Sequence, residues 1–101
     1  MLRRGISDAG LSRIASAVGY KVAYNLPEMF PVYSSNVESY GYDAENADLY
    51  VRFMAKGNSP SSLYVYRNVE PDTYFAFMEA ESKGKFIWSD IRSRYEYERL
   101  E

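Results

Sequence analysis

The sequence predicts a small α+β domain, in which a three-stranded antiparallel β-meander is covered by one main helix and a short following helix. Two segments, 49–54 and 63–67, alternate in character with the period of a β-strand. Segment 71–83 begins with proline and carries apolar residues at the spacing of a helix face. At 101 residues the chain has room for a single hydrophobic core.

Residues 1–33 are interpreted as an N-terminal arm, helical and then extended, that precedes the domain at 34–101. Residues 7–19 begin with a serine that can cap a helix, continue with apolar residues at helical spacing and end with glycine. Residues 21–24 look extended, and two prolines beyond them prevent any helix from continuing. Residues 2–31 carry four basic and two acidic side chains, so a mildly basic arm precedes an acidic body.

The domain is expected to begin with three strands. The first, at 37–42, does not alternate strictly, so a bulge is expected near 39–41. The second, at 49–54, has the cleanest alternation and turns its leucine, valine and phenylalanine toward the core. A polar loop at 56–62 leads to the third strand at 63–67, which pairs most simply with the second in an antiparallel meander.

Two helical segments are expected to follow the strands. The first, at 71–83, has proline at its first position, and Tyr74 and Phe77 belong to the stripe that faces the sheet. Gly84 is expected to end this helix in a left-handed conformation. A second short helical turn at 86–91 packs its apolar side inward and is followed by a polar tail.

The composition excludes several classes of function. The chain has no cysteine and no histidine, so disulfides, thiolate zinc sites and cysteine nucleophiles are excluded, and the commonest general base is absent. We therefore expect a non-enzymatic protein without a cofactor. The formal net charge of −2 argues against coating of nucleic acid or anionic membrane by overall charge, and leaves only a local basic patch for such contacts.

Membrane insertion and secretion are not expected. No stretch approaches the length of a transmembrane helix, and the first eight residues lack the apolar segment of a secretory signal. We therefore expect a soluble, cytoplasmic protein with no membrane partner.

Several short motifs follow one another in a characteristic order. They are Ser34–Val37, Gly41–Asp43, Leu49–Phe53, Tyr64–Tyr66, Asn68–Pro71, Ala80–Phe86, Ile91–Arg92 and Tyr95–Leu100. In this order they resemble the KTSC family, a small domain also found at the C-terminus of some lysyl-tRNA synthetases, over about two thirds of the chain. The resemblance implies no established activity. RNA binding is suggested for the family by its link to the synthetases, and stand-alone members occur in bacteria and phages.

Three features depart from the family pattern. The loop between Phe53 and Tyr64 is longer than the usual tight hairpin, Trp88 stands where a polar residue is expected, and the first 33 residues have no counterpart. We expect an added apolar surface, with the arm packed near Trp88.

Two tyrosines are the leading candidates for contact with RNA. Tyr64 and Tyr66 project from the same face of one strand, as the aromatic residues of single-stranded RNA readers do. The alternative is that the helix covers this face and both rings belong to the core. The remaining candidates would form a basic rim or, because acidic residues are interleaved with them, an ordinary solvated surface. These basic candidates are Arg67, Lys83, Lys85, Arg92 and Arg94.

The main alternative is a protein-interaction or assembly subunit, such as a small phage virion component. Its candidate contacts are Arg3, Arg4, Met29, Phe30 and Trp88. A small-ligand binder ranks last, because no glycine-rich cradle is present. RNA and protein neighbours are thus the expected partners, in that order.

Overall fold

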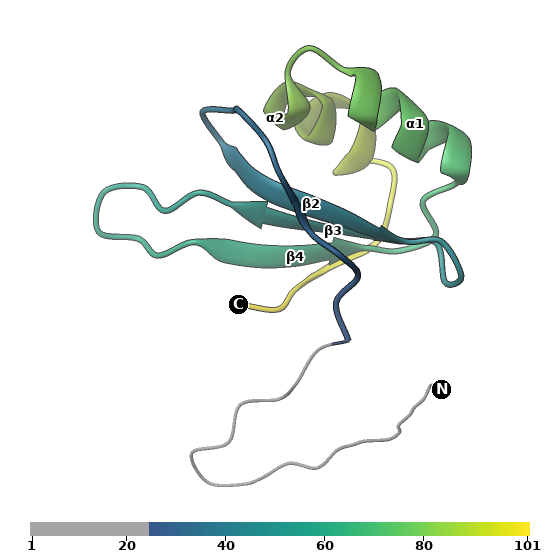
Figure 1. Cartoon of the computed structure of the whole chain (residues 1–101), viewed down its shortest axis with the longest axis horizontal. Coiled ribbons are helices and arrows are strands. Elements are labelled where there is room, and N and C mark those ends of the chain that lie inside the picture. Colours follow the sequence, from purple (N-terminus) through teal and green to yellow (C-terminus); the bar gives the residue numbers. More distant parts are fainter. Residues whose placement is uncertain (1–24) are drawn as a thin grey trace, which may run out of the picture.

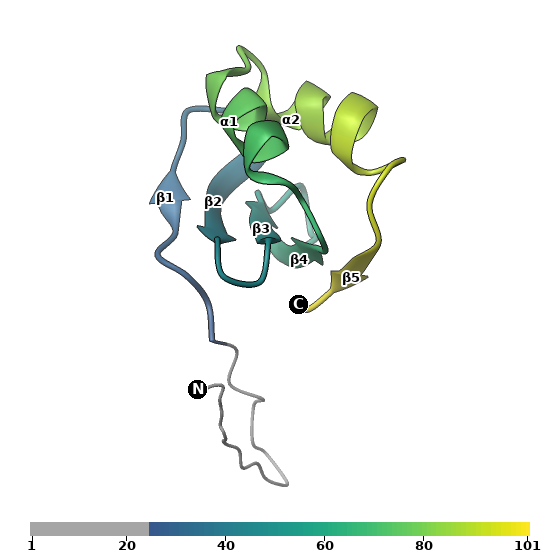
Figure 2. The same ribbon diagram turned by 90° about the vertical axis from the view of Figure 1, so that its right-hand side faces the viewer.

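The structure is a computed structural model that describes residues 25–101, so the predicted helix at 7–19 and the extended segment at 21–24 lie outside it. Its strands are β1 (Phe30–Pro31), β2 (Val37–Asp43), β3 (Asp48–Phe53), β4 (Ser62–Tyr66) and β5 (Tyr97–Arg99). They form one antiparallel sheet in sequence order, with helices over one face (Figures 1 and 2). The α+β class is confirmed, but the predicted three-stranded meander is the middle of a five-stranded sheet.

Three helical segments follow β4: α1 (Pro71–Glu79), α2 (Lys83–Phe86) and η1 (Ile87–Ile91). The predicted helix at 71–83 begins at Pro71 as expected but ends early, because Ala80 is extended at ψ 137°. The Ser82 hydroxyl accepts a hydrogen bond from the Lys85 amide at 3.2 Å and caps a new helix. Gly84 therefore lies inside α2, and the prediction that it ends the first helix was wrong.

A bulge in β2 sets which side chains face the helices. Val37 pairs with Phe53 and Ser39 pairs with Arg52, so Glu38 is the extra residue, one position before the predicted range of 39–41. An extra residue resets the alternation of a strand. After it, Tyr40 faces the helices together with Val37.

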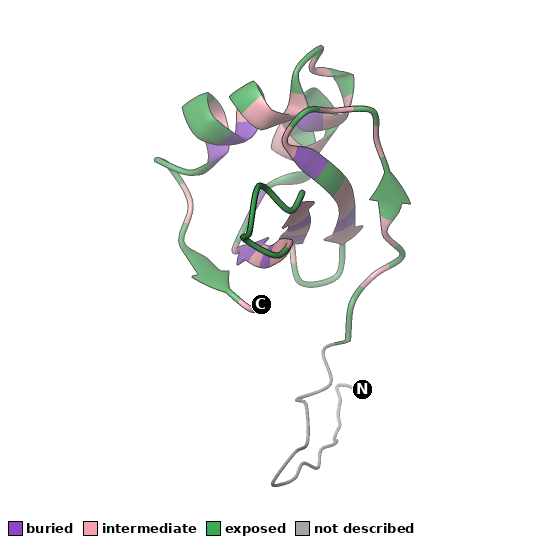
Figure 3. Ribbon diagram, turned by 90° about the vertical axis from the view of Figure 1, so that its left-hand side faces the viewer, coloured by how far each residue is buried: buried purple, intermediate pink, exposed green. Residues whose placement is uncertain are grey.

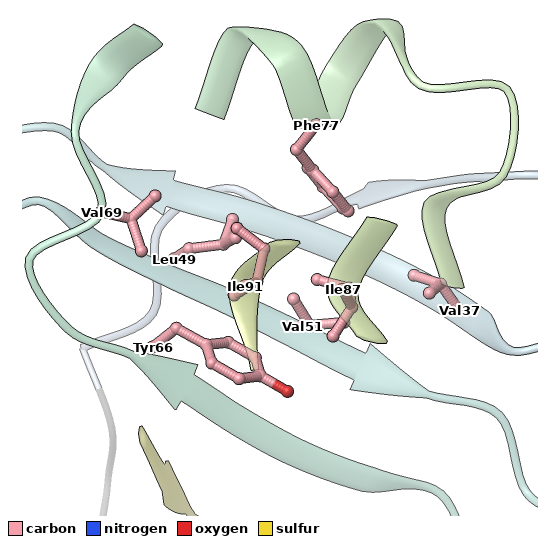
Figure 4. Packing of buried hydrophobic residues seen from close by; sticks show 8 residues of the cluster. All are labelled: Val37, Leu49, Val51, Tyr66, Val69, Phe77, Ile87 and Ile91. Atoms are coloured by element: carbon pink, nitrogen blue, oxygen red, sulfur yellow. The ribbon is translucent and has the colours of Figure 1, made fainter. Parts of the chain in front are cut away.

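The core lies between the helices and the centre of the sheet (Figures 3 and 4). Phe77 of α1 is fully buried, and its ring meets Tyr40 edge to face at 5.2 Å between centroids. The helices therefore pack against the centre of the sheet and do not cover its β4–β5 side completely. The buried cluster is Val37, Leu49, Val51, Tyr66, Val69, Phe77, Ile87 and Ile91.

The described part of the predicted arm lies against β2. β1 pairs Phe30 with Tyr40, and the residues just before it cross Gly41. A Cβ atom at Gly41 would lie 2.5 Å from the Glu28 carbonyl oxygen and 2.7 Å from Met29 Sδ, so only glycine permits this close approach. Residues 25–33 thus follow the β1–β2 edge, whereas the sequence had suggested that the arm packs near Trp88.

The turn between β2 and β3 contains a strained residue. Ala47 has φ of 59°, a left-handed conformation that costs an L-residue about 1 kcal/mol and glycine nothing. We expect Ala47→Gly to raise the free energy of unfolding by about 0.5–1 kcal/mol, measured by urea denaturation. Ala44→Gly, in the same turn, should lower it slightly, and equal effects of the two substitutions would contradict the assignment of strain.

Candidate functional site

A groove of about 1110 Å³ opens on the helix side of the sheet, beside the core. Its floor is formed by β3 and β4, one wall by the β3–β4 hairpin, the other wall by α2 and η1, and one end by β5. We call it the aromatic-basic groove. The lining residues that define it are Phe53, Lys56, Tyr64, Tyr66, Lys85, Trp88, Arg92, Tyr97 and Arg99.

The floor consists of stacked aromatic rings. Strand alternation puts Tyr64 and Tyr66 on one face of β4, with their rings nearly parallel at 6.3 Å. The Tyr64 ring also meets the Phe53 ring edge to face, with 5.6 Å between ring centres. The tilted ring of Tyr97 lies 5.9 Å from it, again between centres. Tyr66 is 2% exposed and belongs to the core, whereas Tyr64 is half-buried. Each of the two sequence interpretations therefore applies to one tyrosine, since Tyr66 is core and Tyr64 lies open to the groove.

Burial raises the pKa of Tyr66 to about 12, with a further contribution from the neighbouring Tyr64. Because the unfolded value is about 10, folding favours the neutral phenol. Its contribution to stability is complete below about pH 10 and is lost as pH rises toward about 12. We expect the free energy of unfolding to fall above about pH 10, and Tyr66→Phe to reduce this fall in urea denaturation. An unchanged fall in the variant would contradict this assignment.

The helical wall presents a tryptophan and an arginine. Ile87 and Ile91 are buried against the sheet, and the Arg92 amide donates to the Ile87 carbonyl at 2.7 Å, which makes η1 a π-helical turn. Trp88 and Arg92 follow these residues at the same spacing and share the outer face. The Arg92 guanidinium lies 4.4 Å from the centre of the Trp88 ring, which is 68% exposed.

The opposite wall is the β3–β4 hairpin, the loop whose length departs from the family pattern. Lys56 and Ser59 exchange backbone hydrogen bonds of 3.0 and 2.8 Å around the tip. Gly57 has φ of 56°, as the first central residue of a type II′ turn requires. Asn36 anchors the hairpin, since its backbone oxygen accepts from Met54 at 2.8 Å and its Oδ1 accepts from Lys56 Nζ at 2.5 Å.

Positive charge is concentrated in the groove although the chain is acidic overall. No aspartate or glutamate is among the described residues that line it. Within residues 25–101, the groove cations form no salt bridge with an acidic side chain. Like charges around a concave, partly apolar surface create a local positive potential. The groove cations are Lys56, Lys85, Arg92 and Arg99.

The other three predicted basic contacts lie elsewhere and have structural partners. Arg67 forms ion pairs with Asp48 and Glu98. Lys83 Nζ donates to the carbonyls of Met78 and Ala80, both at 2.8 Å, and so caps the end of α1. The Arg94 guanidinium lies over the Tyr95 ring, 5.6 Å from its centre. The structure therefore brings together Tyr64, Tyr66, Lys85 and Arg92, but not Arg67, Lys83 or Arg94.

The protein-interaction candidates do not form one surface in the described residues. Met29 is half-buried against Gly41, and Phe30 is exposed on edge strand β1. Trp88 lies in the aromatic-basic groove, on the β4–β5 side of the sheet. The candidates Arg3 and Arg4 lie outside the described residues.

Sequence reasoning missed four residues of the groove, of which Phe53 had been expected only to face the core. Tyr97 and Arg99 belong to β5, which was interpreted as a polar tail. The alternation of residues 95–99, with glutamate at both even positions, was the signal for a strand that turns Tyr97 and Arg99 to one side. Lys56 had no such signal, because its place depends on the anchoring of the hairpin to Asn36.

Two negative findings apply to residues 25–101. No three of their His, Cys, Asp and Glu side chains gather where they could hold a metal ion. None of the helices in this part of the chain is long and apolar enough to span a bilayer. The groove offers a ligand planar rings and positive charges.

A family model and a solved structure name the same family. The family model described as KTSC domain matches residues 33–95. The crystal structure of a KTSC domain protein from Yersinia pestis has a TM-score of 0.63 and 30% sequence identity, and the match covers 73% of this chain and 97% of that one. A protein from Tsukamurella paurometabola is 33% identical over 67 residues, which are 66% of this chain and 92% of the relative. The chain therefore belongs to the KTSC domain family.

Proposed function

We propose that the protein is a non-enzymatic module that binds single-stranded RNA in the aromatic-basic groove. The observation that carries this proposal is the composition of the groove: four cations and five aromatic rings, with no acidic residue among the described residues that line it, in a chain of net charge −2. Cations contact phosphates, and aromatic rings stack on bases. Both kinds of side chain line one concavity, which suits a polymer of bases and phosphates.

A single strand fits this groove better than a duplex does. In a duplex the faces of the bases are already stacked, so half-exposed rings such as those of Tyr64 and Tyr97 gain a partner only from unstacked bases. The occurrence of KTSC domains at the C-terminus of some lysyl-tRNA synthetases supports RNA as the natural ligand.

The test is fluorescence anisotropy of a labelled single-stranded oligoribonucleotide across a salt titration. We expect Lys85→Gln/Arg92→Gln to weaken binding by about 10-fold and to reduce the slope of log affinity against log salt by about 1.4, since each lost phosphate contact removes about 0.7. Arg94→Gln removes the same kind of charge outside the groove and should change neither quantity. Equal affinity and slope for the wild type and the double variant would refute the groove as the binding site.

Protein interaction is the second candidate function, and a separate observation favours it. An aromatic stripe runs from Phe30 on β1 through Tyr40 and Tyr74 to Phe75 on α1, with successive ring centroids 6.0, 6.2 and 6.1 Å apart. Phe75 is 54% exposed and Phe30 is also exposed, so the stripe offers an apolar surface. Sedimentation equilibrium should then show a dimer that Phe75→Ser dissociates, and a monomer at every concentration would reject self-association.

A further inference from the structure

We propose that the outer end of the aromatic-basic groove is a slot for one unpaired nucleobase. A depression of about 310 Å³ lies there, lined by Trp88, Arg92, Ser93 and Tyr97. Three of these residues also line the main groove, so the depression adjoins it across these side chains. This inference rests on the proposed function and adds to it a place, a number of bases and a mode of recognition.

The slot is built from planar groups. Trp88 is 68% exposed, so the single guanidinium stacked on it leaves much of the indole free. Tyr97, 44% exposed, lies in the same depression, and its ring is held by Tyr66 and Tyr64 at 5.7 and 5.9 Å. A flat ring that enters the depression can therefore stack without requiring the protein to build a new surface.

The charge of the slot selects an anionic ligand that carries such a ring. Aromatic pockets also bind quaternary ammonium groups, through the negative faces of their rings. Here the Arg92 guanidinium already occupies the position over Trp88 that a ligand cation would need. Asp90 is the nearest acidic residue along η1, but it does not line the slot, and its carboxylate accepts a hydrogen bond from the Ser89 hydroxyl. A guanidinium stacked on a ring keeps its N–H groups in its own plane, where they can contact a phosphate.

The base must be unpaired to reach the slot. A base within a helix has both faces stacked and its pairing edge occupied, so it reaches a side depression only when it is splayed out of the stack. The rest of the strand then follows the main groove past Arg92 and Lys85.

Trp88 makes this proposal directly testable, because it is the only tryptophan in the chain and it lines the slot, so its fluorescence responds to a ring that stacks there. The full chain is titrated with a short oligoadenylate RNA and with an RNA backbone of equal length and charge that lacks bases. We expect oligoadenylate to quench Trp88 and to bind about 10-fold more tightly than the abasic strand.

Substitutions separate stacking from a structural role. Measured by anisotropy of labelled strands, Trp88→Leu should weaken oligoadenylate binding several-fold, leave abasic binding and the salt slope unchanged, and so reduce discrimination between the two strands. Trp88→Phe should restore most of the discrimination. Phe75→Leu removes an exposed ring outside the groove and should have no effect.

The outcomes distinguish the slot from the groove. Salt-dependent binding of both strands with equal affinity, and without quenching of Trp88, would overturn the slot and leave the proposed function standing. Absence of binding to either strand at low salt would overturn both. Discrimination that is undiminished in Trp88→Leu would place base recognition elsewhere and overturn the slot.

Discussion

Phe77→Ala is expected to lower the free energy of unfolding by about 3–5 kcal/mol. Phe77 is the fully buried side chain of α1, and its ring packs between Tyr40 of β2 and Phe86 of α2. Removing it leaves a cavity where the first helix, the second helix and the sheet meet. A domain of about this size is stable by about 5–10 kcal/mol, so the variant should be partly unfolded under mild conditions. Urea denaturation followed by circular dichroism measures the loss.

Phe75→Ala is the matched control, since it removes the same side chain from the same helix. Phe75 is exposed, so the expected change is within about 0.5 kcal/mol. A loss at Phe77 no larger than that at Phe75 would contradict the packing of α1 described above.

Arg67→Met is expected to cost about 2 kcal/mol at neutral pH. Arg67 pairs with Asp48, whose side chain is 12% exposed, so its removal leaves a largely buried carboxylate without its ion-pair partner. The expected loss is below the about 3–5 kcal/mol of fully buried pairs, because the Arg67 side chain is 38% exposed. Exposed Arg94→Met should change stability little. Denaturation in urea at neutral pH measures both.

The loss in Arg67→Met should depend on pH. Burial raises the pKa of Asp48, against the lowering effect of Arg67. A raised folded pKa means that ionisation disfavours the fold, so stability falls as pH rises through that pKa, and more steeply without Arg67. The cost of the substitution should therefore shrink as pH is lowered below the pKa of Asp48.

Because Arg67 lies outside the groove, its variant should keep the wild-type salt slope for RNA, and a reduced slope would contradict this placement.

The parts of the fold that sequence predicted are those with strong local signals. β3 and β4 alternate cleanly, and Pro71 marks the start of α1. β1 is two residues long, too short for a periodic signal, and β5 is three residues long, with only the short alternation at 95–99 to mark it. The pairing of both strands depends on residues distant in the sequence. Ser82-Lys83-Gly84 is compatible with the end of one helix or the start of another. In the structure the segment starts a new helix, and Ile87, which follows this helix, is buried against the sheet.

The candidate site was predicted in part for a related reason. Tyr64 and Tyr66 share a face by alternation, and Lys85 and Arg92 happen to lie on the wall beside them. Lys83 and Arg94 are near these residues in sequence but point to other partners, which a list of basic residues cannot reveal. Trp88 stood out as a departure from the family pattern and was assigned to protein contacts. The structure places it in the groove with the cations.

The most direct test of the groove as an RNA site is a titration of isotope-labelled protein with a short single-stranded RNA, followed by amide chemical shifts. We expect progressive shifts at Lys56, Tyr64, Lys85, Trp88 and Arg99, which meet only in the aromatic-basic groove. Residues on the other face of the sheet, such as Tyr50 and Val65, should stay unchanged. Shifts confined to the Phe30–Phe75 stripe or to the other face, or none at low salt, would contradict the account.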